Sequence, residues 1–265
     1  MTYDKILQRQ IWNDFFINAP DNSYSIYFHA KYGNDLGLDP SIKAQQIKTM
    51  QTEWGGMSLV LVELDLLQTA LSDQQNQRFY LLSYACIPLY NFTTFQHKLL
   101  SHRYSMFDII PQESMPWNGR FPRYSKLQEK FPEAIIFKHS QWLVLIREHA
   151  QFLVQKQNRL RQEFRNIEIP DEAAFGVFLS INGKIGEIWN RPVTATYWAT
   201  GLINHFDKVT AYDIQNARST GAIAMRKVKE SAVISDQVKM LINETLRMED
   251  VITKKRVVIN YEDDI

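Results

Sequence analysis

The sequence lacks the features that mark several large classes of protein. Its 265 residues include one cysteine, Cys86, which excludes an internal disulfide framework and a zinc site built from several thiolates. Its 30 Lys and Arg nearly balance 29 Asp and Glu, so any anion site must be local, and no nucleic-acid partner is expected. No stretch approaches the ~20 apolar residues of a membrane span, and no apolar leader core is visible. As written, we expect a soluble chain, and one thiol suits a reducing, cytoplasmic location.

Several catalytic motifs are also missing. Neither a P-loop nor a G-x-G-x-x-G loop occurs, which leaves no standard phosphate-binding loop. Ser83 does not lie in a G-x-S-x-G elbow, and we interpret both Ser83 and Cys86 as packing residues. There is no Asp-x-Asp motif, and the six histidines are dispersed. Because a metal site needs three or four converging ligands, we expect neither a metal nor another cofactor.

What is present is a series of apolar patterns separated by turn signals. Strands that alternate with helices favour an α/β layered domain with a mostly parallel sheet. Without an internal repeat or a low-complexity linker, the chain is interpreted as one domain, and the proline-rich segment Pro111–Pro132 as a long ordered loop. The expected elements, in chain order, are a helix through Leu7, Ile11 and Phe15, a strand over Tyr24–His29, a helix from Gly55-Gly56 to Ala70, a strand over Phe79–Ser83, a helix capped by Asn91 or Thr93 and ending at Leu100, a long helix with a basic outer face over Leu143–Phe164, a short helix over Asp171–Ser180, a last helix over Gln237–Leu246 and a last strand over Arg256–Tyr261.

Two short segments carry charges that suit chemistry. Pro170-Asp171-Glu172 opens a helix, and capping explains Asp171 well. Glu172 either joins the first turn or points into a cleft, and both interpretations stay open. The basic run Arg226–Lys229 is either a solvated face or a cationic clamp for a phosphate group, which Lys208 could join.

The order of the motifs is more specific than any one of them. The chain resembles the core-2/I-branching β-1,6-N-acetylglucosaminyltransferases, especially the plant-type branch of unassigned substrate. The resemblance covers most of residues 10–235. The segments that carry it are Trp12–Phe16, Tyr24–Ala30, Glu53–Ser58, Phe79–Ser83, Cys86–Thr94, Arg123-Tyr124, Ser140-Gln141-Trp142 with Arg147, Pro170-Asp171-Glu172 and Ala224–Lys227.

The resemblance implies a fold and an activity. The expected fold is a GT-A-like nucleotide-sugar-binding sheet flanked by helices, with residues 1–110 as the nucleotide-binding half and 111–265 as the acceptor and catalytic half. The expected activity is inverting, metal-independent transfer of a sugar, N-acetylglucosamine or xylose, from a UDP-sugar to a glycan hydroxyl. By similarity Glu172 is the catalytic base. The implied donor-binding residues are Trp54, His29, Arg226, Lys227, Lys208 and His205, and the implied acceptor-binding residues are Glu113, Arg120, Arg123 and Trp142.

The chain also departs from the family pattern. The family's first strand is apparently missing, and Val257–Tyr261 is one segment that could replace it. Ala30 stands where animal members have a uridine-binding acid. Cys86 also replaces an acid, which argues against the core-2 acceptor. The membrane anchor of the Golgi type II family members is not seen either.

These departures keep two alternatives open. One is a degenerate family member that binds a nucleotide or carbohydrate. The other is an interaction protein that uses the basic helix expected over residues 143–164.

Overall fold

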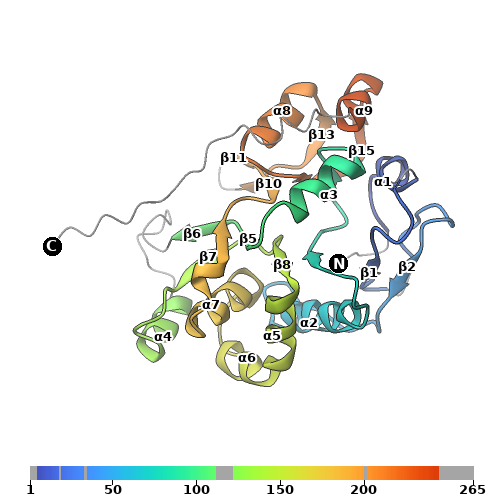
Figure 1. Cartoon of the computed structure of the whole chain (residues 1–265). Helices are drawn as coiled ribbons and strands as arrows, with labels where there is room; N and C mark the ends of the chain where they lie inside the picture. Colours follow the sequence, from blue (N-terminus) through green and yellow to red (C-terminus); the bar gives the residue numbers. More distant parts are fainter. Residues whose placement is uncertain (1–4, 18, 33–34, 112–121, 200–201, 245–265) are drawn as a thin grey trace.

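The computed structural model describes residues 5–17, 19–32, 35–111, 122–199 and 202–244 of the chain (Figure 1). The predicted strand at Arg256–Tyr261, and with it Val257–Tyr261, lies outside these residues. The helices are α1 (Arg9–Phe16), α2 (Met57–Leu71), α3 (Phe92–Leu100), α4 (Pro122–Lys130), α5 (Arg147–Gln155), α6 (Gln157–Phe164), α7 (Ala174–Ile181), α8 (Ala211–Ser219) and α9 (Asp236–Asn243), with short 3-10 helices η2 (Pro170–Glu172) and η3 (Ile185–Glu187). The strands are β1 (Ile26–Phe28), β2 (Ala44–Gln46), β3 (Arg78–Tyr80), β4 (Ile87–Pro88), β5 (Ser105–Phe107), β6 (Ile109–Pro111), β7 (Phe137–His139), β8 (Val144–Ile146), β9 (Ile188–Asn190), β10 (Thr194–Thr196), β11 (Trp198–Ala199), β12 (Leu202–Ile203), β13 (Phe206–Val209), β14 (Ala224–Arg226) and β15 (Val228–Ile234).

Two large groups of buried side chains hold the layers together. In Figure 1, α2, α5, α6 and α7 lie on one side of the central strands, and α3, α8 and α9 lie on the other. The first group packs α2, α5, α6 and α7 against β3 and β8, and the second packs α1, α3, α8 and α9 against β4 and β14. The expectation of a mixed α/β chain is confirmed.

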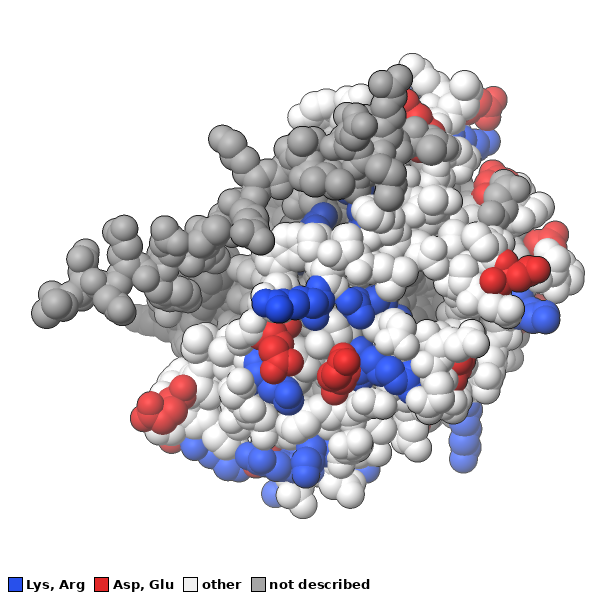
Figure 2. Space-filling view, viewed as in Figure 1, with Lys and Arg blue, Asp and Glu red and all other residues white. Residues whose placement is uncertain are grey.

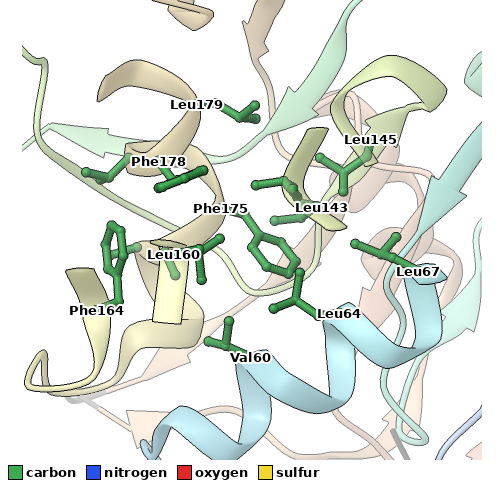
Figure 3. Close-up of a cluster of buried hydrophobic side chains, with 14 of the residues drawn as sticks. Val60, Leu64, Leu67, Leu143, Leu145, Leu160, Phe164, Phe175, Phe178 and Leu179 are labelled. Carbon is green, nitrogen blue, oxygen red and sulfur yellow. The ribbon is translucent and has the colours of Figure 1, made fainter. Parts of the chain in front are cut away.

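Helix α2 shows how the sequence pattern produces the first core. Val60, Leu64 and Leu67 lie on one helical face and are at most 2% exposed. Figure 3 shows Phe175 of α7 directed toward Leu64 across this interface. Full burial of each such side chain contributes about 1.5–3 kcal/mol, so this face fixes α2 beneath η2 and α7.

Polar caps set the start of three helices. The side chain of Asn91 accepts a hydrogen bond from the backbone N–H of Thr94 at 2.9 Å, which identifies Asn91 rather than Thr93 as the cap of α3. Thr210 and Asp213 form a reciprocal capping box on α8, and Ser235 caps α9. Such caps satisfy backbone donors that a helix leaves unpaired at its N-terminus.

The sheet prediction requires a correction, because the strands form several short ladders of mixed direction. The four-stranded sheet has the order β3-β8-β5-β9, in which β8 pairs antiparallel with β3 and β5 while β5 pairs parallel with β9. A second sheet, β10-β14-β4, joins one parallel and one antiparallel pair. A mostly parallel sheet was therefore wrong.

The long helix expected over Leu143–Phe164 is also wrong. Val144–Ile146 form strand β8, which is buried at every residue, and such an apolar run cannot be assigned to helix or strand by periodicity alone. Helix α5 begins only at Arg147, and a non-helical residue, Lys156, separates it from α6. Within the predicted loop Pro111–Pro132, helix α4 begins at Pro122, since proline is well tolerated in the first turn of a helix.

An apolar cavity of about 530 Å³ lies between strands β1 and β3. Among the described residues each of these two strands has a ladder partner on one side only, β2 for β1 and β8 for β3. Glu63 and Trp142 line part of this cavity. Every described helix is too short or too polar to cross a membrane.

Candidate functional site

Glu172 closes the short helix η2, and a lysine from a neighbouring strand contacts it. Nζ of Lys138, in the middle of β7, lies 2.7 Å from Oε2 of Glu172, and the two side chains are 20% and 24% exposed. Ile169, the residue just before η2, has φ 49° and ψ 56°, a left-handed conformation that is strained for a β-branched side chain. Its N–H donates to the backbone oxygen of Gly55 at 3.0 Å. This contact ties η2 to the turn before α2.

Two buried acids lie beneath Glu172. Burial raises the pKa of Glu63 well above its usual value, and the nearby Asp171 carboxylate raises it further. Nε2 of Gln141 donates to Oε1 of Glu63 at 2.9 Å. Because an isolated carboxylate is costly to bury, this environment favours the neutral form of Glu63. Asp171, adjacent to Glu172, is only 8% exposed.

The basic part of the site is built on β14. Arg226, its last residue, is 8% exposed, and its guanidinium lies 4.5 Å from the centre of the Trp142 ring. Its Nε is buried without a hydrogen-bond partner in the described part of the chain. Burial lowers its pKa. Among the described ion pairs, no carboxylate is matched with Arg226, although buried charges are normally paired.

Lys227 and His205 lie side by side next to Arg226. The backbone N–H of Phe206 donates to the Lys227 oxygen at 2.8 Å, and the N–H of Lys227 donates to the Asn204 oxygen at 3.5 Å. Burial, followed by the charge of Arg226, lowers the pKa of Lys227. Burial, followed by the charges of Lys227, Lys229 and Arg226, lowers the pKa of His205. The structure therefore brings three of the predicted donor-binding residues together: the cations Arg226 and Lys227, and His205.

The segment from Lys138 to Trp142 joins the acidic and basic parts. Lys138 contacts Glu172, and four residues later Trp142 contacts Arg226. Four residues span at most about 14 Å even when fully extended. One short segment therefore links Glu172, through Lys138, to Arg226, through Trp142. The apolar cavity reaches Glu63 and Trp142, whereas Glu172, Arg226 and Lys227 do not line it.

The other predicted site residues have different positions. Trp54 is 87% exposed, on the turn whose Gly55 contacts Ile169. His29 is 1% exposed, and its Nε2 accepts a hydrogen bond from the backbone N–H of Met50 at 3.0 Å. Lys208 is exposed on β13, where it lies opposite Val233 of β15. Val233 is near the far end of β15, whereas Lys227 comes just before its first residue.

Three predicted acceptor residues lie in or near the undescribed loop, and the fourth is Trp142. Glu113 and Arg120 lie outside the described residues, and for Arg123 only the backbone, within α4, is described. Trp142 is 7% exposed, and its ring contacts the guanidinium of Arg226.

Sequence reasoning did not select Lys138 or Glu63, and it named Gln141 only as part of the Ser140-Gln141-Trp142 motif. The available signal was a single lysine inside the apolar run Ala134–His139 and a glutamate on the apolar face of α2. Figure 2 shows that cationic and anionic side chains intermingle across the middle of one face of the molecule. Within the described residues, no group of three or more His, Cys, Asp or Glu side chains is arranged to hold a metal ion.

Comparison with known proteins gives two matches. A family model described as Core-2/I-Branching enzyme matches residues 1–222. A rice protein named Glycosyltransferase BC10, from Oryza sativa subsp. japonica, is 28% identical over 197 residues, which is 71% of this chain. The chain spans 45% of the length of that relative. Since the family match extends over most of the sequence and includes Glu172, the chain belongs to the Core-2/I-Branching enzyme family.

Proposed function

We propose that this protein is a glycosyltransferase that moves a sugar from a UDP-sugar to a glycan hydroxyl with inversion. The observation that carries the proposal is the buried Arg226, stacked on Trp142, without a carboxylate partner among the described residues. A buried cation without a protein anion suits an anionic ligand. The relative's printed name, Glycosyltransferase BC10, supports the same reaction class.

On the donor side, negative charge develops on the departing diphosphate as the glycosidic bond breaks. We assign its stabilisation to Arg226 and Lys227, with His205 beside them. A planar guanidinium binds two phosphate oxygens at once, and fixed cations in a partly buried site need little reorganisation. In this proposal these side chains do the work that a divalent cation does in other transferases.

On the acceptor side, a sugar hydroxyl is a poor nucleophile. We assign Glu172 as the general base that accepts its proton while the oxygen attacks the anomeric carbon. Inversion places the base and the diphosphate on opposite sides of that carbon. The segment 138–142 contacts Glu172 through Lys138 and Arg226 through Trp142. These contacts at its two ends support a base and a diphosphate site that face each other across the reacting sugar.

The exposed indole of Trp54 gives the donor base a surface to stack on. Trp54 is 87% exposed, and its neighbour Gly55 accepts a backbone hydrogen bond from Ile169, three residues before Glu172. A large exposed aromatic ring beside a polar site suits a planar ligand. We therefore propose that Trp54 stacks on the uracil ring of the donor. The proposed sugar, N-acetylglucosamine or xylose, is the one that the family resemblance implies.

The test compares transfer or hydrolysis of UDP-N-acetylglucosamine and UDP-xylose, with and without EDTA. We expect Glu172→Gln to lose turnover while it still binds UDP in calorimetry. Arg226→Met should weaken UDP binding at least tenfold. Lys229→Gln is the matched control, because Lys229 belongs to the same basic run but pairs with Asp207 at 2.8 Å.

Each part of the proposal can fail separately. Equal turnover by the wild type and Glu172→Gln would remove the assigned base. Loss of turnover in EDTA would remove the metal-independent mechanism. Tight UDP binding without turnover of either donor would favour a nucleotide-binding module instead.

A further inference from the structure

We infer that Lys138 is a positioning residue that holds Glu172 in the orientation needed to accept the proton of the acceptor. The inference rests on the proposed role of Glu172 and adds a residue to it. The ion pair is 2.7 Å long, and both partners are largely shielded, at 20% and 24% exposure. Exposed ion pairs contribute little, whereas shielding strengthens the attraction between two charges.

Strand β7 holds Lys138 in place. Phe137 and His139, on either side of it, are 1% and 0% exposed, and since side chains alternate along a strand, Lys138 projects from the opposite face. The backbone N–H of Gly176 in α7 donates to Nε2 of His139 at 3.1 Å. Strand β7 is therefore bonded to the helix that immediately follows η2, which fixes Lys138 relative to Glu172.

A second carboxylate lies on the same face as Lys138. In the antiparallel pair of β6 and β7, Ile110 is opposite Lys138, and Asp108 lies two residues before Ile110 on the same face. Diagonal neighbours of this kind are close enough for long side chains to interact. Burial raises the pKa of Asp108, and the charge of Lys138 opposes that shift. Lys138 is thus close to two acids, and the ion pair that it forms is with Glu172.

The experiment measures kcat and KM for the donor in Lys138→Gln, Lys138→Arg and Glu172→Gln. We expect Lys138→Gln to lower kcat by about 10–100-fold, the scale of a small misplacement of a catalytic group, with the KM for the donor unchanged. Lys138→Arg should recover much of the loss because it keeps the charge. Lys130→Gln is the matched control, because Lys130 pairs with Glu163 on the surface.

The outcomes separate this inference from the proposed function. If Glu172→Gln is inactive while Lys138→Gln turns over like the wild type, Lys138 has no positioning role and the proposed base stands. If Lys138→Arg is as slow as Lys138→Gln, the charge is not what matters and the inference is overturned. If Glu172→Gln keeps wild-type turnover, both the base and its positioning residue are refuted. Thermal unfolding of each variant shows whether a lower kcat reflects loss of folded protein.

Discussion

Gly176 is the point at which α7 packs against Phe137 and His139 of β7, and its replacement by alanine tests how the site is assembled. A Cβ atom at this position would lie 2.6 Å from Cε2 of Phe137 and 2.7 Å from Cδ2 of His139. Both distances are well inside van der Waals contact. Because both side chains are fully buried, neither ring has open space to move into. The helix would have to separate from the strand that carries Lys138.

The expected loss of stability follows from two opposing effects. Overpacking of a dense core costs about 1–3 kcal/mol. Alanine is favoured over glycine inside a helix by roughly 0.5–1 kcal/mol, which offsets part of that cost. With the middle value of each range, the net destabilisation of Gly176→Ala should be about 1–2 kcal/mol. For a chain of this size we expect the Tm to fall by about 2–8 °C.

Urea and thermal unfolding measure this loss, and Gly186→Ala is the matched control. Gly186 lies in η3, and no atom comes within 4 Å of a Cβ placed there. We expect this control to stay within about 0.5 kcal/mol of the wild type. Wild-type stability of Gly176→Ala, or equal losses in both variants, would refute the tight packing of α7 on β7.

Three further predictions concern buried polar groups. Burial lowers the pKa of His139 from 6.5 to about 4. Between these two pH values the unfolded chain binds a proton that the folded chain does not, so the free energy of unfolding should fall by up to about 3 kcal/mol as the pH drops from 6.5 to 4. His139→Gln should reduce this dependence of stability on pH in denaturation curves, and an unchanged dependence would contradict the assignment. Burial and the Asp171 carboxylate raise the pKa of Glu63, so the stability that Glu63 contributes is present at low pH and is lost as the pH rises through the raised pKa. Glu63→Gln should therefore raise the Tm relative to the wild type more at pH 8 than at pH 5, and the reverse order would contradict a raised pKa. Arg147 donates hydrogen bonds to three backbone oxygens and to the side chain of Gln74 at 2.7–3.0 Å. Because hydrogen bonds to a charged group contribute about 1.5–3 kcal/mol each, Arg147→Met should lower the free energy of unfolding in urea by about 3 kcal/mol, and Arg147→Lys by an intermediate amount. A loss below about 0.5 kcal/mol in Arg147→Met would show that these bonds are not needed for stability.

The sequence predicted best those elements that depend on near neighbours. Helices α1, α2 and α3 occur where the apolar spacing indicated, and Asn91 caps α3 through a bond to Thr94, three residues away. The family, too, follows from the order of local motifs. Apolar runs without periodicity were less informative, and the segment that forms β8 was placed in a helix for that reason.

The composition of the site was only partly predictable. Glu172, Arg226 and Lys227 were selected from local motifs and resemblance, and in the structure the segment 138–142 contacts both Glu172 and Arg226. His29 was selected in the same way, yet it is buried against Met50. Lys138 was not selected, because a lone lysine in an apolar strand has no recognisable pattern.

The sequence by itself determined helices α1, α2 and α3 and the types of charged residue available for chemistry, because these depend on residues a few positions apart. Only the tertiary structure decided the pairing of short strands, the stacking of Arg226 on Trp142 and the contact of Lys138 with Glu172. These partners are far apart in the chain. They meet because separate apolar faces pack together, and a local pattern does not specify which distant face is the partner.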